Sequence, residues 1–93
     1  MQAHLINNML RTVKEAKSEA VHDQMYELAT YMRNIELLIL QNGNYSDIMK
    51  EIDRYIKRAS NDDIKSGIRK IYEEFNIQRI RNERLDDLLG DSN

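Results

Sequence analysis

The amino-acid sequence predicts an all-α fold, a small helical bundle of three to five helices. Its 93 residues include no proline and only three glycines, far fewer turn residues than a β-sandwich of this length needs. Aromatic residues make up only 6% of the chain, which also favours helix over sheet. Apolar residues recur every three or four positions along most of the chain, which is the period of an amphipathic helix. We expect a single helical domain over residues 1–93.

The first element is a long N-terminal helical region, expected at about residues 3–41. Its apolar stripe runs from Ile6 to Ile39 without losing the helical phase, which indicates one helix or two helices that share an axis. One helix of about 38 residues would be about 57 Å long, longer than a compact domain of this size is wide. The plausible interruption lies in residues 18–24, where Asp23 is a potential N-cap for a second helix.

The next element is an amphipathic helix over residues 46–59. Gly43 suits the left-handed position that follows a helix, so the N-terminal region should end just before it. Ser46 is the expected N-cap of the new helix. Either Ser60 or Asn61 is expected to cap the helix that follows.

The last expected element is a helix over residues 61–75 that continues or kinks into a C-terminal helix over residues 77–89. The apolar stripe changes phase near Asn76, which leaves both alternatives open. Gly67 lies inside the helix, where glycine costs about 1 kcal/mol relative to alanine, so we expect another helix to approach closely there. Gly90 should end the C-terminal helix, and residues 90–93 should form a frayed C-terminus.

Apolar residues are more numerous than one small core needs. The second half of the N-terminal region carries a second stripe opposite its core stripe, and the C-terminal helix carries another. Such surplus faces are typical of proteins that bind a second copy or another protein. The residues expected to form an oligomer or partner-binding face are Tyr26, Ala29, Leu37, Leu40, Ile77, Ile80, Leu85, Leu88 and Leu89.

Basic residues cluster on two helix faces, although the formal net charge of the chain is −2. Clustered lysines and arginines can bind the phosphates of nucleic acid or an acidic partner. Acidic residues dilute both clusters: Glu51 and Asp53 the first, and Glu83, Asp86 and Asp87 the second. The possible contact residues are Lys50, Arg54, Lys57, Arg58, Arg79, Arg81 and Arg84.

Residues that carry catalysis or bind cofactors are sparse. The chain has no cysteine, no G-x-S-x-G motif and no glycine-rich phosphate loop, so we predict no enzyme and no cofactor. Glu19 and His22 have the E-x-x-H spacing of di-iron carboxylate bundles. Those sites need a second such pair, which only a symmetric dimer could supply here. We therefore assign no metal ligand.

These observations favour a non-enzymatic helical interaction module that binds a partner protein, in an inhibitor, adaptor or immunity-type role of the kind found in phages and mobile elements. We expect it to form a homodimer or a higher oligomer. A nucleic-acid-binding regulator and a metal-binding helical bundle are the alternatives. The absence of cysteine, of a signal peptide and of a long apolar segment predicts a cytoplasmic location and no membrane partner.

Overall fold

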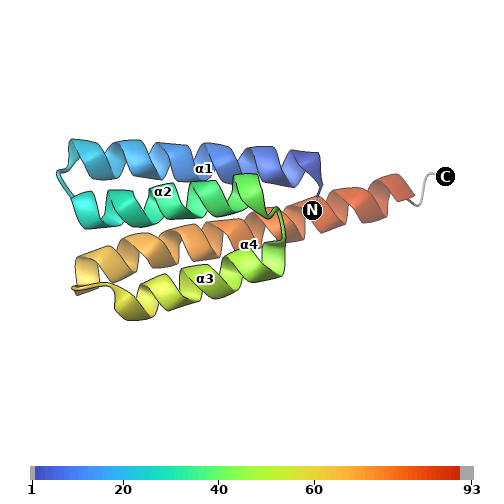
Figure 1. The fold of residues 1–93 in the computed structure, drawn as a ribbon. Helices are drawn as coiled ribbons and strands as arrows, with labels where there is room; N and C mark the ends of the chain where they lie inside the picture. The colour runs from blue at the N-terminus through green and yellow to red at the C-terminus, as the bar shows by residue number, and fades with distance from the viewer. Residues whose placement is uncertain (1, 91–93) are drawn as a thin grey trace.

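The chain forms an all-α bundle, as the sequence predicts (Figure 1). The structure is a computed structural model that describes the backbone of residues 2–90 and the side chains of residues 2–84. Its helices are α1 (Ala3–His22), α2 (Tyr26–Gln41), α3 (Tyr45–Arg58) and α4 (Asp62–Gly90). They run alternately up and down, with α1 beside α2 and α4, and α3 beside α2 and α4. No helix in this part of the chain is long and apolar enough to cross a membrane.

The N-terminal region is a helical hairpin, which corrects the expectation of one helix or two that share an axis. The chain reverses at residues 23–25, so α1 and α2 lie antiparallel (Figure 1). Asp23 does not cap α2 but follows the last residue of α1, and Gln24 adopts a left-handed φ of 60°. The Met25 N–H donates to the Ala20 carbonyl at 2.8 Å, and the Gln24 N–H donates to the Val21 carbonyl at 3.1 Å. These two bonds form the Schellman motif that ends many helices.

The connection between α2 and α3 contains one confirmed feature and one correction. Gly43 has the left-handed φ of 65° expected after a helix. The N-cap of α3 is Asn44 rather than Ser46, because the Asn44 side-chain oxygen accepts a hydrogen bond from the Asp47 N–H at 3.0 Å. Asparagine and serine serve equally well as caps, so composition alone could not distinguish them.

Asn61, one of the two N-caps expected from the sequence, caps the start of α4. Its side-chain oxygen accepts the Ile64 N–H at 2.9 Å. Ser60 instead donates its N–H and its hydroxyl to the Glu27 carboxylate on α2, at 3.0 and 2.7 Å. Helix α4 then runs without interruption past Asn76, so the segments expected over residues 61–75 and 77–89 belong to one helix. Gly90 is its last described residue, and the expected frayed residues 91–93 lie outside the described part.

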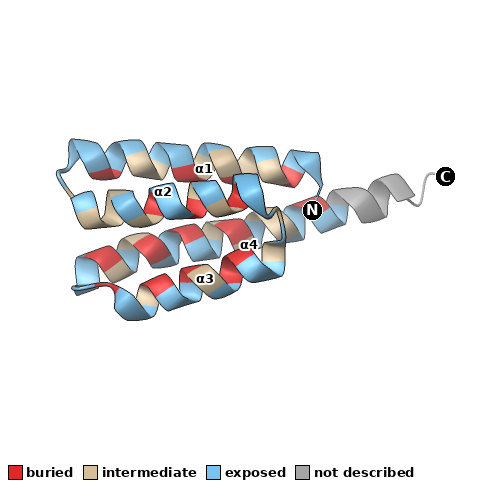
Figure 2. Cartoon of the chain, viewed as in Figure 1, coloured by how far each residue is buried: buried red, intermediate tan, exposed pale blue. Residues whose placement is uncertain are grey.

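One hydrophobic core runs through the bundle (Figure 2). Each helix contributes the stripe that its sequence period predicts, and Phe75 of α4 is fully buried. Two polar contacts join α4 to the N-terminal part of the chain. The Gln78 amide donates to the Thr12 hydroxyl of α1 at 2.7 Å, and the buried Asn82 amide donates to the side-chain oxygen of Gln2 at 3.0 Å. The buried core residues are Leu5, Met9, Val13, Met32, Ile35, Ile39, Ile48, Met49, Ile52, Tyr55, Ala59, Ile64, Ile68, Ile71 and Phe75.

Candidate functional site

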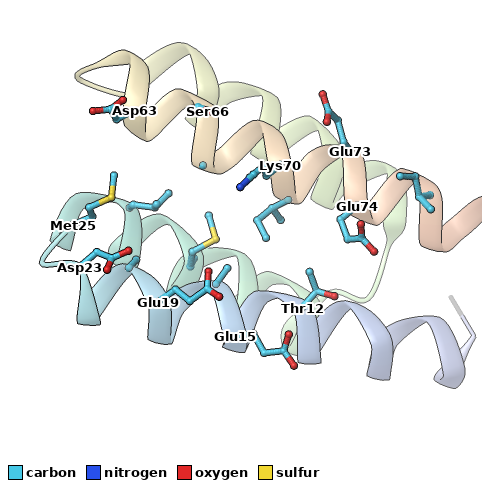
Figure 3. A pocket seen from close by; sticks show the side chains of 17 residues that line it. Thr12, Glu15, Glu19, Asp23, Met25, Asp63, Ser66, Lys70, Glu73 and Glu74 are labelled. Atoms are coloured by element: carbon cyan, nitrogen blue, oxygen red, sulfur yellow. The ribbon is translucent and has the colours of Figure 1, made fainter.

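A groove of about 660 Å³ lies where α1 and α4 run side by side over α2 (Figure 3). Its floor is apolar and combines the small side chains of α1, the glycine and isoleucines of α4, and larger side chains from α2 and from Met25 just before it. Two of the larger side chains are methionines, whose flexible thioethers adapt to different ligand shapes. The floor consists of Ala16, Ala20, Met25, Leu28, Met32, Gly67, Ile71 and Ile77.

Gly67 allows the floor to form. A Cβ atom at this position would lie 2.7 Å from one terminal methyl group of Leu28 and 3.1 Å from the other. The missing side chain therefore lets Leu28 of α2 pack directly against the backbone of α4. The close approach expected at Gly67 is confirmed, and it occurs within the fold.

The rim of this groove is strongly acidic. Glu19 of α1 and Glu74 of α4 point into the space between the two helices, whereas Glu15 and Glu73 line the groove with side chains that point away from this space (Figure 3). Lys70 also points into this space, and among the described residues it is the only basic one that lines the groove. We call the site the acidic groove. Its rim carboxylates are Glu15, Glu19, Asp23, Asp63, Glu73 and Glu74.

The rim carboxylates take part in no ion pair within the described side chains, although Lys70 lines the same groove. Glu74 accepts only a long hydrogen bond from Gln78, at 3.5 Å. The ion pairs of the bundle are Lys17–Glu36, Arg54–Glu51, Lys57–Asp53 and Arg79–Glu83.

The apolar residues predicted to bind a partner do not gather into one face. Tyr26 and Leu40 of α2 are 63% and 62% exposed, and Leu37 is 40% exposed, while Ala29 is half-buried. On α4, Ile77 lines the acidic groove and is 42% exposed, and Ile80 is 40% exposed. The described part of α4 therefore leaves the outer face of α2 uncovered. The side chains of Leu85, Leu88 and Leu89 lie outside the described residues.

The structure gathers four of the seven predicted basic contact residues into a second groove, between α3 and α4. We call it the basic groove, and its volume is also about 660 Å³. Arg79 stacks over the ring of Tyr45 there, with its guanidinium carbon 5.1 Å from the ring centre. Burial raises the pKa of Tyr45 above its usual value of 10.0. The basic residues of this groove are Lys50, Arg54, Lys57 and Arg79, whereas Arg58, Arg81 and Arg84 lie outside it.

The Glu19 and His22 pair acquires no further metal ligands from the fold. Within the described residues, no group of three or more histidine, aspartate or glutamate side chains is placed to hold a metal ion. Glu19 instead belongs to the rim of the acidic groove. The spacing of Glu19 and His22 indicates a metal site, whereas the structure places Glu19 on the surface of a groove.

Sequence reasoning did not find the acidic groove. The i, i+4 spacing of Glu15 and Glu19 places both on one side of α1, but their partners across the groove are about 50 residues further along the chain. Only the antiparallel packing of α1 and α4 brings the two sides together. No protein-family model, curated protein or solved structure matches this chain, so its function is argued from the grooves themselves.

Proposed function

We propose that this chain is a non-enzymatic interaction module whose acidic groove binds a helical segment of a partner protein. The observation that carries the proposal is a concave apolar floor on the surface of a small bundle. An apolar floor loses contact with water when a ligand covers it, and that burial favours binding.

The shape of the groove suits a helix. Its α4 wall extends from Asp63 to Ile77, a rise of about 21 Å at about 1.5 Å per residue. Helices α1 and α4 form its long sides, and apolar residues of α1, α2 and α4 together form its floor. An apolar groove of this kind receives an amphipathic helix in helix-in-groove complexes. The ligand's apolar side chains at i, i+3 and i+4 would lie along the floor.

A single fluorescent label can test the proposal, because the chain has no native cysteine. Ser66 is exposed and lines the acidic groove, so Ser66→Cys carries an environment-sensitive dye at the site. Ser46, which is exposed and lines the basic groove, provides the matched control as Ser46→Cys. The probes are three helical peptides of about 14 residues with the same leucine spacing and with lysine, glutamine or glutamate at all other positions.

We expect at least one of these peptides to shift the emission of the dye at position 66 and not at position 46. A scrambled peptide of the same composition, which has no apolar stripe, should leave both dyes unchanged. If no peptide of any charge affects the dye at position 66, the acidic groove is not a helix-binding site.

The basic groove favours a second candidate function, the binding of nucleic acid. The fold brings Arg79 beside three of the four basic residues of α3, and two tyrosines line the same groove. Positive grooves that contain aromatic rings are typical of proteins that bind single strands. Neutralising Lys50, Arg54 and Lys57 together should abolish binding of a single-stranded oligonucleotide in a fluorescence anisotropy titration. Binding by the native chain that does not weaken with salt would contradict this candidate.

A homo-oligomer is also part of the proposal, formed through the uncovered face of α2. Tyr26 and Leu40 are large and mostly exposed there, and apolar side chains of this size are commonly covered in an assembly. The acidic groove and this face are separate surfaces, so an oligomer would leave the groove open to its ligand.

A further inference from the structure

The charge of the acidic groove identifies the class of helix that it takes. Six of the 16 acidic residues of the chain line this one groove, whereas only Lys70 lines it among the 14 basic residues. The chain as a whole is nearly neutral, with a formal net charge of −2. The excess of negative charge is therefore a local property of the groove.

These carboxylates are available to a ligand. No rim carboxylate forms an ion pair within the described side chains. Acidic residues elsewhere in the bundle do, as in the pairs Lys17–Glu36 and Arg54–Glu51. Like charges that surround a common space repel one another, and a ligand of opposite charge relieves that repulsion. An acidic helix would add to the repulsion instead.

We propose that the acidic groove selects a cationic amphipathic helix, with an apolar stripe on its floor and lysine or arginine side chains over its rim. The inference rests on the proposed function, because it names the class of helix that the same groove binds. The apolar contacts with residues such as Met25 and Leu28 give binding, and the contacts with the rim give selectivity. Lys70 opposes the ligand at one point of the groove, where a cationic side chain is disfavoured.

The test uses the Ser66→Cys protein with its dye and ranks the three peptides of the previous section. We expect the leucine-lysine peptide to bind about tenfold tighter than the leucine-glutamine peptide, because it forms several exposed ion pairs at once. The leucine-glutamate peptide should bind least. The preference should shrink between about 0.1 M and about 1 M salt, as the screening length falls from about 10 Å to about 3 Å.

Matched variants separate the rim from the overall charge. The variant Glu15→Gln, Glu19→Gln and Glu74→Gln should lose the preference for the lysine peptide. The control Glu51→Gln, Asp53→Asn and Glu83→Gln makes the same change of net charge on carboxylates that already have basic partners, and it should keep the preference. The Lys70→Gln variant should bind the lysine peptide more tightly than the native chain does, because it lacks the one basic side chain that the described residues contribute to the groove.

Circular dichroism and urea unfolding confirm that each variant is folded, and relief of repulsion should leave the rim variant at least as stable as the native chain. Equal binding of the lysine and glutamine peptides would overturn the inference while the proposed function stands. An equal loss of binding in the rim and control variants would also overturn it, because net charge would then explain the effect. A silent dye with all three peptides would instead refute the proposed function.

Discussion

Gln24 holds the one left-handed backbone conformation among the described non-glycine residues, with a φ of 60°. An L-residue pays about 1–2 kcal/mol in this region, and glycine avoids that cost. The position completes the Schellman motif that ends α1, where glycine is the usual residue. The absence of glycine explains why the sequence pattern concealed this turn.

Gln24→Gly is expected to stabilise the protein by about 0.5–1 kcal/mol. Relief of the left-handed strain exceeds the extra freedom that glycine gives the unfolded chain. Urea unfolding followed by circular dichroism measures the change, with Gln24→Ala as a control that should gain nothing. A glycine variant no more stable than the native chain would show that the turn is not strained.

Gly67→Ala is expected to change the free energy of unfolding by less than about 1 kcal/mol, because two effects oppose each other. Alanine gains about 1 kcal/mol in helix propensity, while its Cβ displaces the Leu28 side chain. Leu28 is only partly buried and can move into the acidic groove. The variant should therefore retain stability and bind helical peptides more weakly in the dye assay. A stability loss above about 2 kcal/mol would mean that Leu28 cannot move.

At the scale of elements, the helices and their core faces follow from sequence, whereas their turns do not. Apolar period alone predicts the buried stripes of α3 and of α4 up to Phe75. The same period cannot reveal the hairpin of α1 and α2, because its three-residue connection is close to one helical turn and preserves the phase. The change of phase at Asn76 falls within one continuous helix, and the apolar residues Ile77 and Ile80 that follow it are partly exposed rather than in the core.

The contact between α2 and the start of α4 is expected to be sensitive to acid. The side-chain hydrogen bond from Ser60, together with its backbone N–H, lowers the pKa of Glu27 below its usual value of 4.5. A lowered pKa in the folded state means that the carboxylate stabilises the fold above about pH 4.5, and this contribution is lost as pH falls through the folded-state pKa.

Glu27→Gln tests this sensitivity, since glutamine carries no charge at any pH. The native chain should be more stable than the variant at pH 7, and the difference should shrink below about pH 4.5. Urea titrations at several pH values measure both proteins. A difference that stays constant down to pH 3 would show that the Glu27 charge does not matter.

At the scale of the whole molecule, most of the predicted contact residues lie on separate surfaces. The sequence placed Lys50, Arg54 and Lys57 on one helix face, and the fold brings Arg79 of α4 into the same groove. It could not locate the acidic groove, because that site exists only where residues near position 19 and residues near position 70 meet. Contacts between distant segments are not encoded in helical periodicity.

Leu37→Glu with Leu40→Glu tests the proposed oligomer. Both side chains are exposed in the single chain, 40% and 62%, so the change should cost a monomer little stability. Light scattering at two protein concentrations should give the native chain a mass above 11.0 kDa and the variant a mass near it. Identical masses for the two proteins would exclude this face of α2 as the interface.

The position of α4 between the two grooves has a consequence for how partners approach. One flank of this helix borders the acidic groove, whose rim carboxylates form no ion pair within the described side chains. The other flank borders the basic groove, where Arg54, Lys57 and Arg79 are paired with carboxylates and Lys50 adds a further positive charge. Negative charge is therefore concentrated on one side of the molecule. A net charge of −2 conceals this lateral dipole. The field of such a dipole exerts a torque on a charged partner before contact, and it turns the matching groove toward that partner during diffusion.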